Sequence, residues 1–426
     1  MRLRLSPLAA AILAIAIAGC ESGDVRPTAP RGATALERFV VVGGDISAGA
    51  AGGGLTAASQ VTAWPALIAA DAGVTFRQAV VRAPGCSPPL VAPLLIGRWL
   101  SGTGIATRDS SCAGAASTLT PPMDNLALPG ATAYAALQVT PRAIDAAKAA
   151  YDVVDRARYP LVLGPTQSQV TAMLVRTPTL VAVELGLGEV LPAFVTGRVV
   201  AATAYTPASS WTYVPAAVAA PVFSAIGDSI VKSAARVVVL TAPRLSRLPA
   251  FRTGAQVAAQ RVALAGYGVT VATDCEASAN VIHVSAKLPA LVQAALRTGV
   301  AQPFSCTDSA DAADRVLTPA QVATLDAVVD AINAQVRQLA QAHGWAVADL
   351  DAAFTTMAAA APAFDARREL TCAQPYGPYF SLDGLRPSAT GQRLVADVVA
   401  AALNAKFGYA LPVAGTPLTL LADPCG

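Results

Sequence analysis

Charged side chains and histidines are both scarce in this sequence. Only 13% of the 426 residues are Asp, Glu, Lys or Arg, and the chain has two histidines, His283 and His343. The formal net charge is +3, and no run or stripe of basic residues indicates a nucleic-acid partner. The sequence also lacks a Cys-x-x-Cys pair and a histidine cluster, so we expect neither a metal nor a cofactor.

Apolar residues, by contrast, are abundant. They make up 54% of the chain, which supports a large buried core and argues against disorder. The length alone allows one large domain or two or three smaller ones.

The first 20 residues have the pattern of an export signal. Residues 1–4 carry two arginines, and residues 8–18 form an apolar run too short to span a membrane. Residues 17–20, Ile-Ala-Gly-Cys, resemble a bacterial lipobox, in which Cys20 becomes the lipidated first residue of the mature protein. The alternative is an ordinary secretory cleavage site that happens to contain a cysteine.

The lipobox interpretation predicts a bacterial cell-envelope protein whose domain lies outside the cytoplasm. Its acyl chains would be its contact with the membrane, each buried methylene contributing about 0.8 kcal/mol. Glu21 follows Cys20 in place of the aspartate associated with inner-membrane retention, which favours the outer membrane.

Six further cysteines follow Cys20. An even number in an exported chain indicates disulfides, although six cysteines allow 15 pairings. We favour the pairings between neighbours in sequence, which are Cys86–Cys112, Cys275–Cys306 and Cys372–Cys425.

The chain is organised around residues 39–49, Phe-Val-Val-Val-Gly-Gly-Asp-Ile-Ser-Ala-Gly. Four apolar β-formers run into two glycines and a small-residue turn. This is typical of a buried strand that ends where an open α/β sheet carries its site.

This stretch resembles the first block of the SGNH/GDSL hydrolases, an apolar strand followed by Gly-Asp-Ser-Leu-Ser/Thr-x-Gly with the first serine as nucleophile. Without a gap, the matching positions are Gly43, Ile46, Ser47 and Gly49. Gly44 stands at the position of the family's aspartate, and Asp45 stands at the position of the nucleophile.

Three later stretches resemble the other blocks of that family. Gly130 matches the glycine whose backbone N–H helps to form the oxyanion hole. In the third block Gly188 replaces the asparagine that donates to the oxyanion, and Glu189 replaces the following aspartate. In the last block Asp383 matches the triad aspartate, and Arg386 stands at the position of the catalytic histidine.

The resemblance implies an α/β fold, a three-layer α/β/α sandwich with a mainly parallel, flavodoxin-like sheet of about five strands. We expect a tether over residues 21–36, one domain over 37–410 and a C-terminal tail over 411–426. Insertions are expected at about 82–122, near the mouth of the site, and at 245–317. In the second insertion, residues 269–273 and 281–284 are expected to pair as strands.

An active member of the family needs a serine, a histidine, an aspartate and oxyanion donors. Arg386 cannot act as a base near neutral pH, and the charge of Asp45 would repel an oxyanion. The resemblance therefore implies an impaired site and a binding or scaffold role, with an acyl or ester compound as ligand. We expect Asp45 and Arg386 to form an ion pair, shared with Asp383, in the old catalytic centre.

The alternative function is an active ester or acyl hydrolase that uses non-standard residues. A one-residue deletion in the alignment would keep Asp45 at the family's aspartate and bring Ser47 towards the nucleophile position. A base would then have to come from elsewhere, and His283 and His343 are the available histidines. We expect His283 on a strand face and His343 exposed at a helix end.

Two other patterns imitate active-site motifs. Residues 227–230 spell Gly-Asp-Ser-Ile, but they fall within an expected helix over 223–235, so Ser229 is not expected to be a nucleophile. Asp349 and Asp351 resemble a catalytic pair, yet they are expected at a solvated strand end.

Overall fold

The computed structural model describes residues 33–116, 118–205, 211–309, 313–415 and Cys425. The expected export signal, Cys20 and most of the expected tether lie outside these residues. Among the described residues, no helix combines the length and the apolar character needed to cross a membrane.

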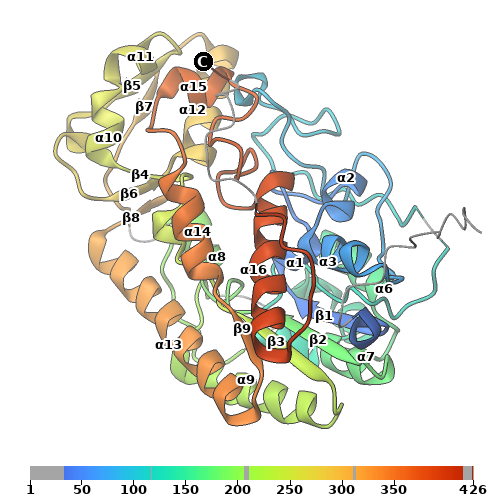
Figure 1. The fold of residues 1–426 in the computed structure, drawn as a ribbon. Helices are drawn as coiled ribbons and strands as arrows, with labels where there is room; N and C mark the ends of the chain where they lie inside the picture. Colours follow the sequence, from blue (N-terminus) through green and yellow to red (C-terminus); the bar gives the residue numbers. More distant parts are fainter. Residues whose placement is uncertain (1–32, 117, 206–210, 310–312, 416–424, 426) are drawn as a thin grey trace, which may run out of the picture.

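A parallel sheet of four strands forms the centre of the fold (Figure 1). Its order is β1 (Phe39–Gly43), β2 (Leu180–Glu184), β3 (Arg236–Leu240) and β9 (Ala346–Ala348). All strand neighbours are parallel, and β1 and β2 are buried along their whole length. Their continuous apolar sequences fit strands that are covered on both faces.

A short segment continues the sheet beyond β1. Val41 N donates to Asp124 O (2.9 Å), and Leu126 N donates to Val41 O (2.8 Å), which makes a parallel bridge between Val41 and Asn125. The sheet therefore has four strands, against the expected number of about five, with residues 124–128 as an edge segment bonded to β1.

Two groups of helices pack around the sheet. One group contains α3 (Trp64–Ala72), α14 (Leu350–Ala359) and α16 (Ala389–Phe407). The other contains α4 (Ala133–Gln138), α7 (Gln169–Val175), α9 (Ala216–Val231) and α13 (Pro319–His343). The remaining helices of this part are α1 (Asp45–Ala48), α2 (Ala57–Val61), α5 (Pro141–Ala146), α6 (Val153–Val162) and α8 (Leu191–Thr196).

The helix ends follow local sequence signals. At the start of α13, the Thr318 hydroxyl accepts from Gln321 N (3.3 Å) and the Gln321 side chain accepts from Thr318 N (2.6 Å). Gly344 ends this helix in the left-handed conformation (φ 67°), which favours glycine.

The described chain begins with a short 3-10 helix, η1 (Ala33–Leu36), inside the stretch expected to be a tether. Leu36 is fully buried, and η1 packs against α3. The last four residues of the expected tether are therefore part of the folded domain.

Most of the described residues of the expected insertion at 245–317 form a lobe at the upper left of Figure 1. Its apolar residues between Val257 and Val316 belong to a second core, while Leu245 to Phe251 and Leu317 belong to the main core. The expected pairing of residues 269–273 with 281–284 is wrong. Instead β5 (Val269–Val271) pairs with β7 (Gln302–Phe304), while β6 (Val281–His283) lies between β4 (Phe251–Thr253) and β8 (Val316–Leu317). Apolar alternation predicts strands but does not specify their partners. The lobe's helices are α10 (Gly254–Ala259), α11 (Arg261–Ala265) and α12 (Val284–Thr298), and α15 (Ala366–Thr371) joins its core.

The other expected insertion, at 82–122, has no α-helix or strand among its described residues, and it contacts this lobe. Its short helix η2 (Leu94–Ile96) packs against α12, where Gln293 Nε2 donates to Leu95 O (2.8 Å). All three expected disulfides are present, namely Cys86–Cys112, Cys275–Cys306 and Cys372–Cys425.

Residues 227–230 lie inside α9, as expected. The Ser229 hydroxyl donates to Ala225 O (2.8 Å), one turn back in the same helix. Ser229 therefore does not occupy the turn that a nucleophile of this type needs.

Replacing Gly227 by alanine should stabilise the protein. Glycine in a helix interior is less favourable than alanine by about 0.5–1 kcal/mol, and a Cβ here would meet only side chains, the nearest being Leu339 Cδ2 at 3.3 Å. Chemical denaturation of Gly227→Ala should show a gain of this size. A loss of stability would mean that Leu339 cannot move aside.

Candidate functional site

Four of the predicted site residues meet beside the carboxyl ends of β1 and β2. Asp45 is the first residue of α1, directly after β1, and Gly130 follows the edge segment of the sheet. Asp383 and Arg386 lie in the turns before α16. Parallel strands bring such loops to one edge of a sheet.

Arg386 lies between two carboxylates. Its Nε and Nη2 are 2.6 and 2.5 Å from Asp45 Oδ1, and its Nη1 is 2.8 Å from Asp383 Oδ2. The Arg386 side chain is 15% exposed, while those of Asp45 and Asp383 are 2% and 8% exposed. The expected ion pair is thus confirmed, including its third member, and it is buried.

The backbone N–H of Gly130 also belongs to this cluster. It donates to Asp45 Oδ2 (2.7 Å), so the carboxylate of Asp45 is bonded through both of its oxygens. The donor that the family resemblance assigns to an oxyanion is therefore already used by a side chain of the protein.

Asp383 accepts hydrogen bonds from five donors. Oδ1 accepts from the Ser381 hydroxyl, Leu385 N and Arg386 N, and Oδ2 accepts from Gly53 N and Arg386 Nη1. Burial alone would raise the pKa of Asp383, but the charge of Arg386 and these N–H groups outweigh it and lower that pKa. Burial would lower the pKa of Arg386, and the two carboxylates raise it instead. Both groups are charged at neutral pH.

A tight turn covers the cluster. Ala51 and Gly54 form an isolated bridge, and between them Gly52 N donates to the Ser381 hydroxyl (3.0 Å) while Gly53 N donates to Asp383 Oδ2 (2.9 Å). Both glycines have positive φ values, of 57° and 80°, which an L-residue adopts at a penalty. The excursion at 82–122 packs on this turn through Leu90 N, which donates to Gly52 O (2.8 Å). The described residues of 82–122 therefore contact the turn that covers the cluster.

Position 188 cannot supply a side-chain donor to an oxyanion, because no side chain fits there. A Cβ at this position would lie 2.4 Å from Ala131 O and 2.8 Å from Ala131 C. The loop that carries Gly130 therefore runs directly over Gly188. This close approach of two backbones was not predicted from the sequence.

Glu184 is a further buried residue of the site that the sequence analysis missed. Its Oε2 accepts from Gly44 N and Ser47 N, each at 3.0 Å, and the residue is 3% exposed. Burial raises the pKa of Glu184 to about 7, although these N–H groups oppose the rise. The signal for it was a carboxylate at the end of an otherwise apolar strand.

Glu189 contacts the other end of the loop formed by residues 130–133. Its Oε1 accepts from Ala133 N (2.6 Å) and from the Tyr205 hydroxyl (3.1 Å), while Oε2 has no hydrogen-bond partner among the described residues. The side chain is fully buried, and burial raises the pKa of Glu189 to about 7.

The alternative nucleophile, Ser47, is not accessible. It is fully buried in α1, and its hydroxyl accepts from Trp64 Nε1 (3.1 Å). An ester cannot reach this oxygen unless α1 moves, so the alternative alignment does not supply an exposed nucleophile in this structure.

The two histidines have the structural roles that were expected. His283 is 4% exposed, its Nδ1 lies 3.1 Å from Val195 O, and burial lowers its pKa to about 4. His343 is exposed at the end of α13 and lies against the Trp345 ring (5.0 Å between centroids). In the described part of the chain, neither histidine is hydrogen bonded to Asp45.

Asp349 and Asp351 also have structural roles. Asp349 caps α14 by accepting from Ala352 N (3.2 Å), and it pairs with Arg337 (2.8 Å). Asp351 accepts from the backbone and the guanidinium of Arg244, each at 2.9 Å.

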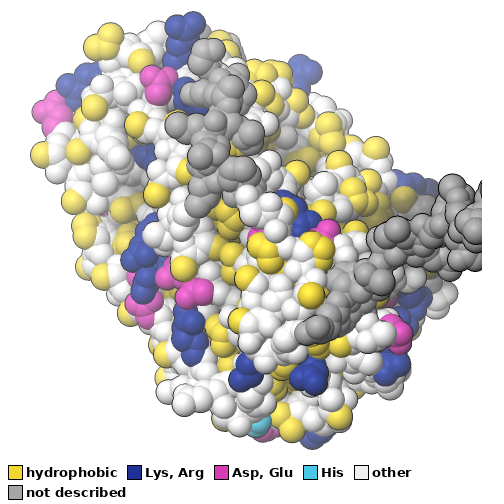
Figure 2. Space-filling view, in the orientation of Figure 1, with side chains coloured by type: hydrophobic (Ala, Val, Ile, Leu, Met, Phe, Trp, Pro, Cys, Tyr) yellow, Lys and Arg dark blue, Asp and Glu magenta, His cyan; other side chains and the backbone are white. Residues whose placement is uncertain are grey.

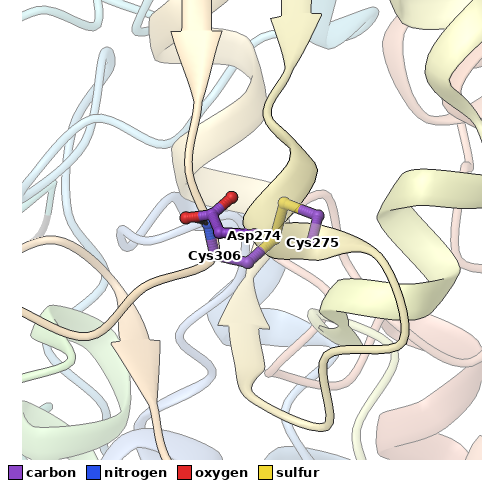
Figure 3. A group of neighbouring side chains, drawn as sticks. All are labelled: Asp274, Cys275 and Cys306. Carbon is purple, nitrogen blue, oxygen red and sulfur yellow. Dashed lines mark hydrogen bonds between the residues drawn. A yellow bond between two sulfur atoms is a disulfide. The ribbon is translucent and has the colours of Figure 1, made fainter.

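Asp274, Cys275 and Cys306 bring potential metal-ligand atoms together in the second insertion (Figure 3). The two sulfurs are bonded to each other and are therefore not thiolates. The Asp274 carboxylate accepts from Cys306 N (3.1 Å) and from the backbone and hydroxyl of Thr307 (3.1 and 2.7 Å). The disulfide and these hydrogen bonds explain why the three side chains lie close together.

Gly188→Ala should destabilise the protein by about 1–3 kcal/mol, because the added methyl meets backbone atoms that can move only with the whole 130–133 loop. Urea denaturation measures the loss, and Gly227→Ala is the matched control. Unchanged stability would show that the loop moves easily. A side chain that donates to an oxyanion would then be sterically allowed at position 188.

Glu189→Gln should raise the melting temperature at pH 8 and leave it nearly unchanged at pH 5. The pKa of Glu189 is higher in the folded state than in the unfolded chain, so the folded state loses stability as the pH rises from about 4.5 to about 7. Glutamine imitates the protonated acid and should recover up to about 3 kcal/mol above that range. Equal melting temperatures at pH 8 would contradict a raised pKa of Glu189 in the folded state.

No family model and no curated protein matches the chain. Among solved structures, a protein from Parabacteroides merdae described as a "putative GDSL-like lipase" aligns with 66% of this chain and 71% of its own, at 11% identity and a TM-score of 0.28. A score this low does not establish a shared fold, so membership of the SGNH/GDSL family stays a prediction.

Proposed function

We propose that this protein is a catalytically inactive SGNH/GDSL hydrolase-like domain with a binding or scaffold role in a bacterial cell envelope, anchored through a lipidated Cys20. The observation that carries the proposal is the salt-bridged cluster of Asp45, Arg386 and Asp383. In the proposed alignment with the family, these three residues stand at the positions of its serine, histidine and aspartate.

The strand order supports the proposed frame, a three-layer α/β/α sandwich. Numbered along the chain, the edge segment is second and β1 is first, so the order is 2-1-3-4-5, as in flavodoxin-like sheets. The cluster lies at the carboxyl ends of the strands, where open sheets of this kind bind ligands.

The chemistry of the cluster argues against acyl transfer. A guanidinium stays protonated at neutral pH, so Arg386 cannot take a proton from a nucleophile. The carboxylate of Asp45 carries the charge that an oxyanion would carry, and it occupies the N–H of Gly130. A reaction that develops negative charge here would be opposed rather than stabilised.

The surface is compatible with a role in binding neutral partners. On the face drawn in Figure 2, the described Lys, Arg, Asp and Glu side chains are scattered, and none of them gather into a continuous basic or acidic patch. The described residues on this face therefore form no basic patch of the kind that binds nucleic acid.

The test is hydrolysis of p-nitrophenyl acetate and butyrate by the chain from Glu21 onward, with an active serine esterase as positive control. We expect no turnover above the buffer rate for the wild type, for Asp45→Ala or for Asp45→Ser/Arg386→His. The double variant should stay inactive because Gly188 still offers no donor. Turnover by the wild type that disappears in Asp45→Ala would overturn the proposal in favour of a hydrolase with non-standard residues.

A further inference from the structure

We infer that Arg386 and the Gly130 N–H form a carboxylate-binding pocket whose ligand in the native protein is the side chain of Asp45. Emptied by removal of that side chain, the pocket would take a small external monocarboxylate, formate or acetate. The inference goes beyond the proposed function, because the pocket exists whether or not the domain has kept any hydrolase activity.

The carboxylate of Asp45 is bound in the way that proteins bind carboxylate ligands. Arg386 Nε donates to Asp45 Oδ1 at 2.6 Å, and Nη2 lies 2.5 Å from the same oxygen as an ion pair. Gly130 N donates to the other oxygen, Oδ2, at 2.7 Å. Charge-assisted bonds of this kind are roughly twice as strong as neutral ones. With 2% of the side chain exposed, hardly any water competes for these donors.

The donors are held in place by groups other than Asp45. Nη1 of Arg386 is bonded to Asp383, which is itself fixed by Gly53 N and Leu385 N. The loop around Gly130 is closed by Ala131 N, which donates to Leu128 O (3.0 Å). The pocket should therefore keep its shape when Asp45 is truncated, which lowers the free energy needed to bind a ligand.

Size and charge define the ligand. Asp45→Ala removes one carboxylate group, which formate replaces, and Asp45→Gly removes one more carbon, which acetate replaces. In both cases Arg386 again lies between two negative charges, as it does in the native protein. The 15% of the Arg386 side chain that is exposed gives the anion a route to the guanidinium.

The test measures thermal unfolding of the full mature chain at constant ionic strength, with sodium chloride replaced stepwise by sodium formate or acetate. Asp45→Ala should melt below the wild type, and formate should raise its melting temperature in proportion to the logarithm of concentration. Asp45→Gly should respond more strongly to acetate than Asp45→Ala does. The wild type, whose pocket is filled, should respond to neither anion.

Two controls separate the pocket from general salt effects. Asp45→Ala/Arg386→Gln should lose the response to formate. Asp71→Ala breaks another carboxylate–arginine pair, with Arg393 at 2.5 Å, but Asp71 is 23% exposed and its loss leaves no closed pocket. We expect no response in that variant. Equal stabilisation by formate and chloride, or a full response in the double variant, would overturn the inference.

If Asp45→Ala does not fold at all, refolding from urea in increasing formate replaces the melting experiment. Formate should increase the recovered folded fraction, and a fraction independent of formate would again overturn the inference. Ester hydrolysis is measured on the same samples. It tests the proposed function, whereas the response to formate tests the pocket. A hydrolase can have the pocket, and an inactive domain can lack it.

Discussion

The placement of one guanidinium between two buried carboxylates governs the rest of this site. Charged groups leave water only when they are paired and their remaining hydrogen-bonding groups are satisfied. Arg386 meets that condition by bonding Asp45 and Asp383, and each of these carboxylates recruits backbone N–H groups as well. These contacts fix the relative positions of three loops, which follow β1, follow the edge segment and precede α16.

This arrangement differs in kind from an active acyl-transfer centre. Such a centre keeps donors unoccupied until an oxyanion forms, and it keeps a base within reach of a nucleophile. Here the N–H of Gly130 is used by Asp45, that of Gly53 is used by Asp383, and the hydroxyl of Ser47 accepts from Trp64. The polar groups that a substrate would need are bonded within the protein itself.

Local signals in the sequence predicted strands and helix ends, whereas the fold class and the ion pair were predicted from the resemblance to the SGNH/GDSL hydrolases. Helix caps such as Thr318 act within a few residues, and the Asp45–Arg386 pair followed from opposite charges at two aligned positions. The exclusion of a side chain at Gly188 was not predictable, because it depends on where the backbone of Ala131 runs. The β5–β7 pairing and the burial of Glu184 depend in the same way on contacts between segments distant in sequence.

The loop over residues 130–133 links these unpredicted features to the predicted ones. It donates one N–H to Asp45 at its beginning and another to Glu189 at its end. Held from both sides, the loop lies flat on Gly188, which explains why that position has no room for a side chain. The residues at positions 45, 188 and 189 therefore depend on one another. Two carboxylates fix the loop, and the fixed loop requires the glycine.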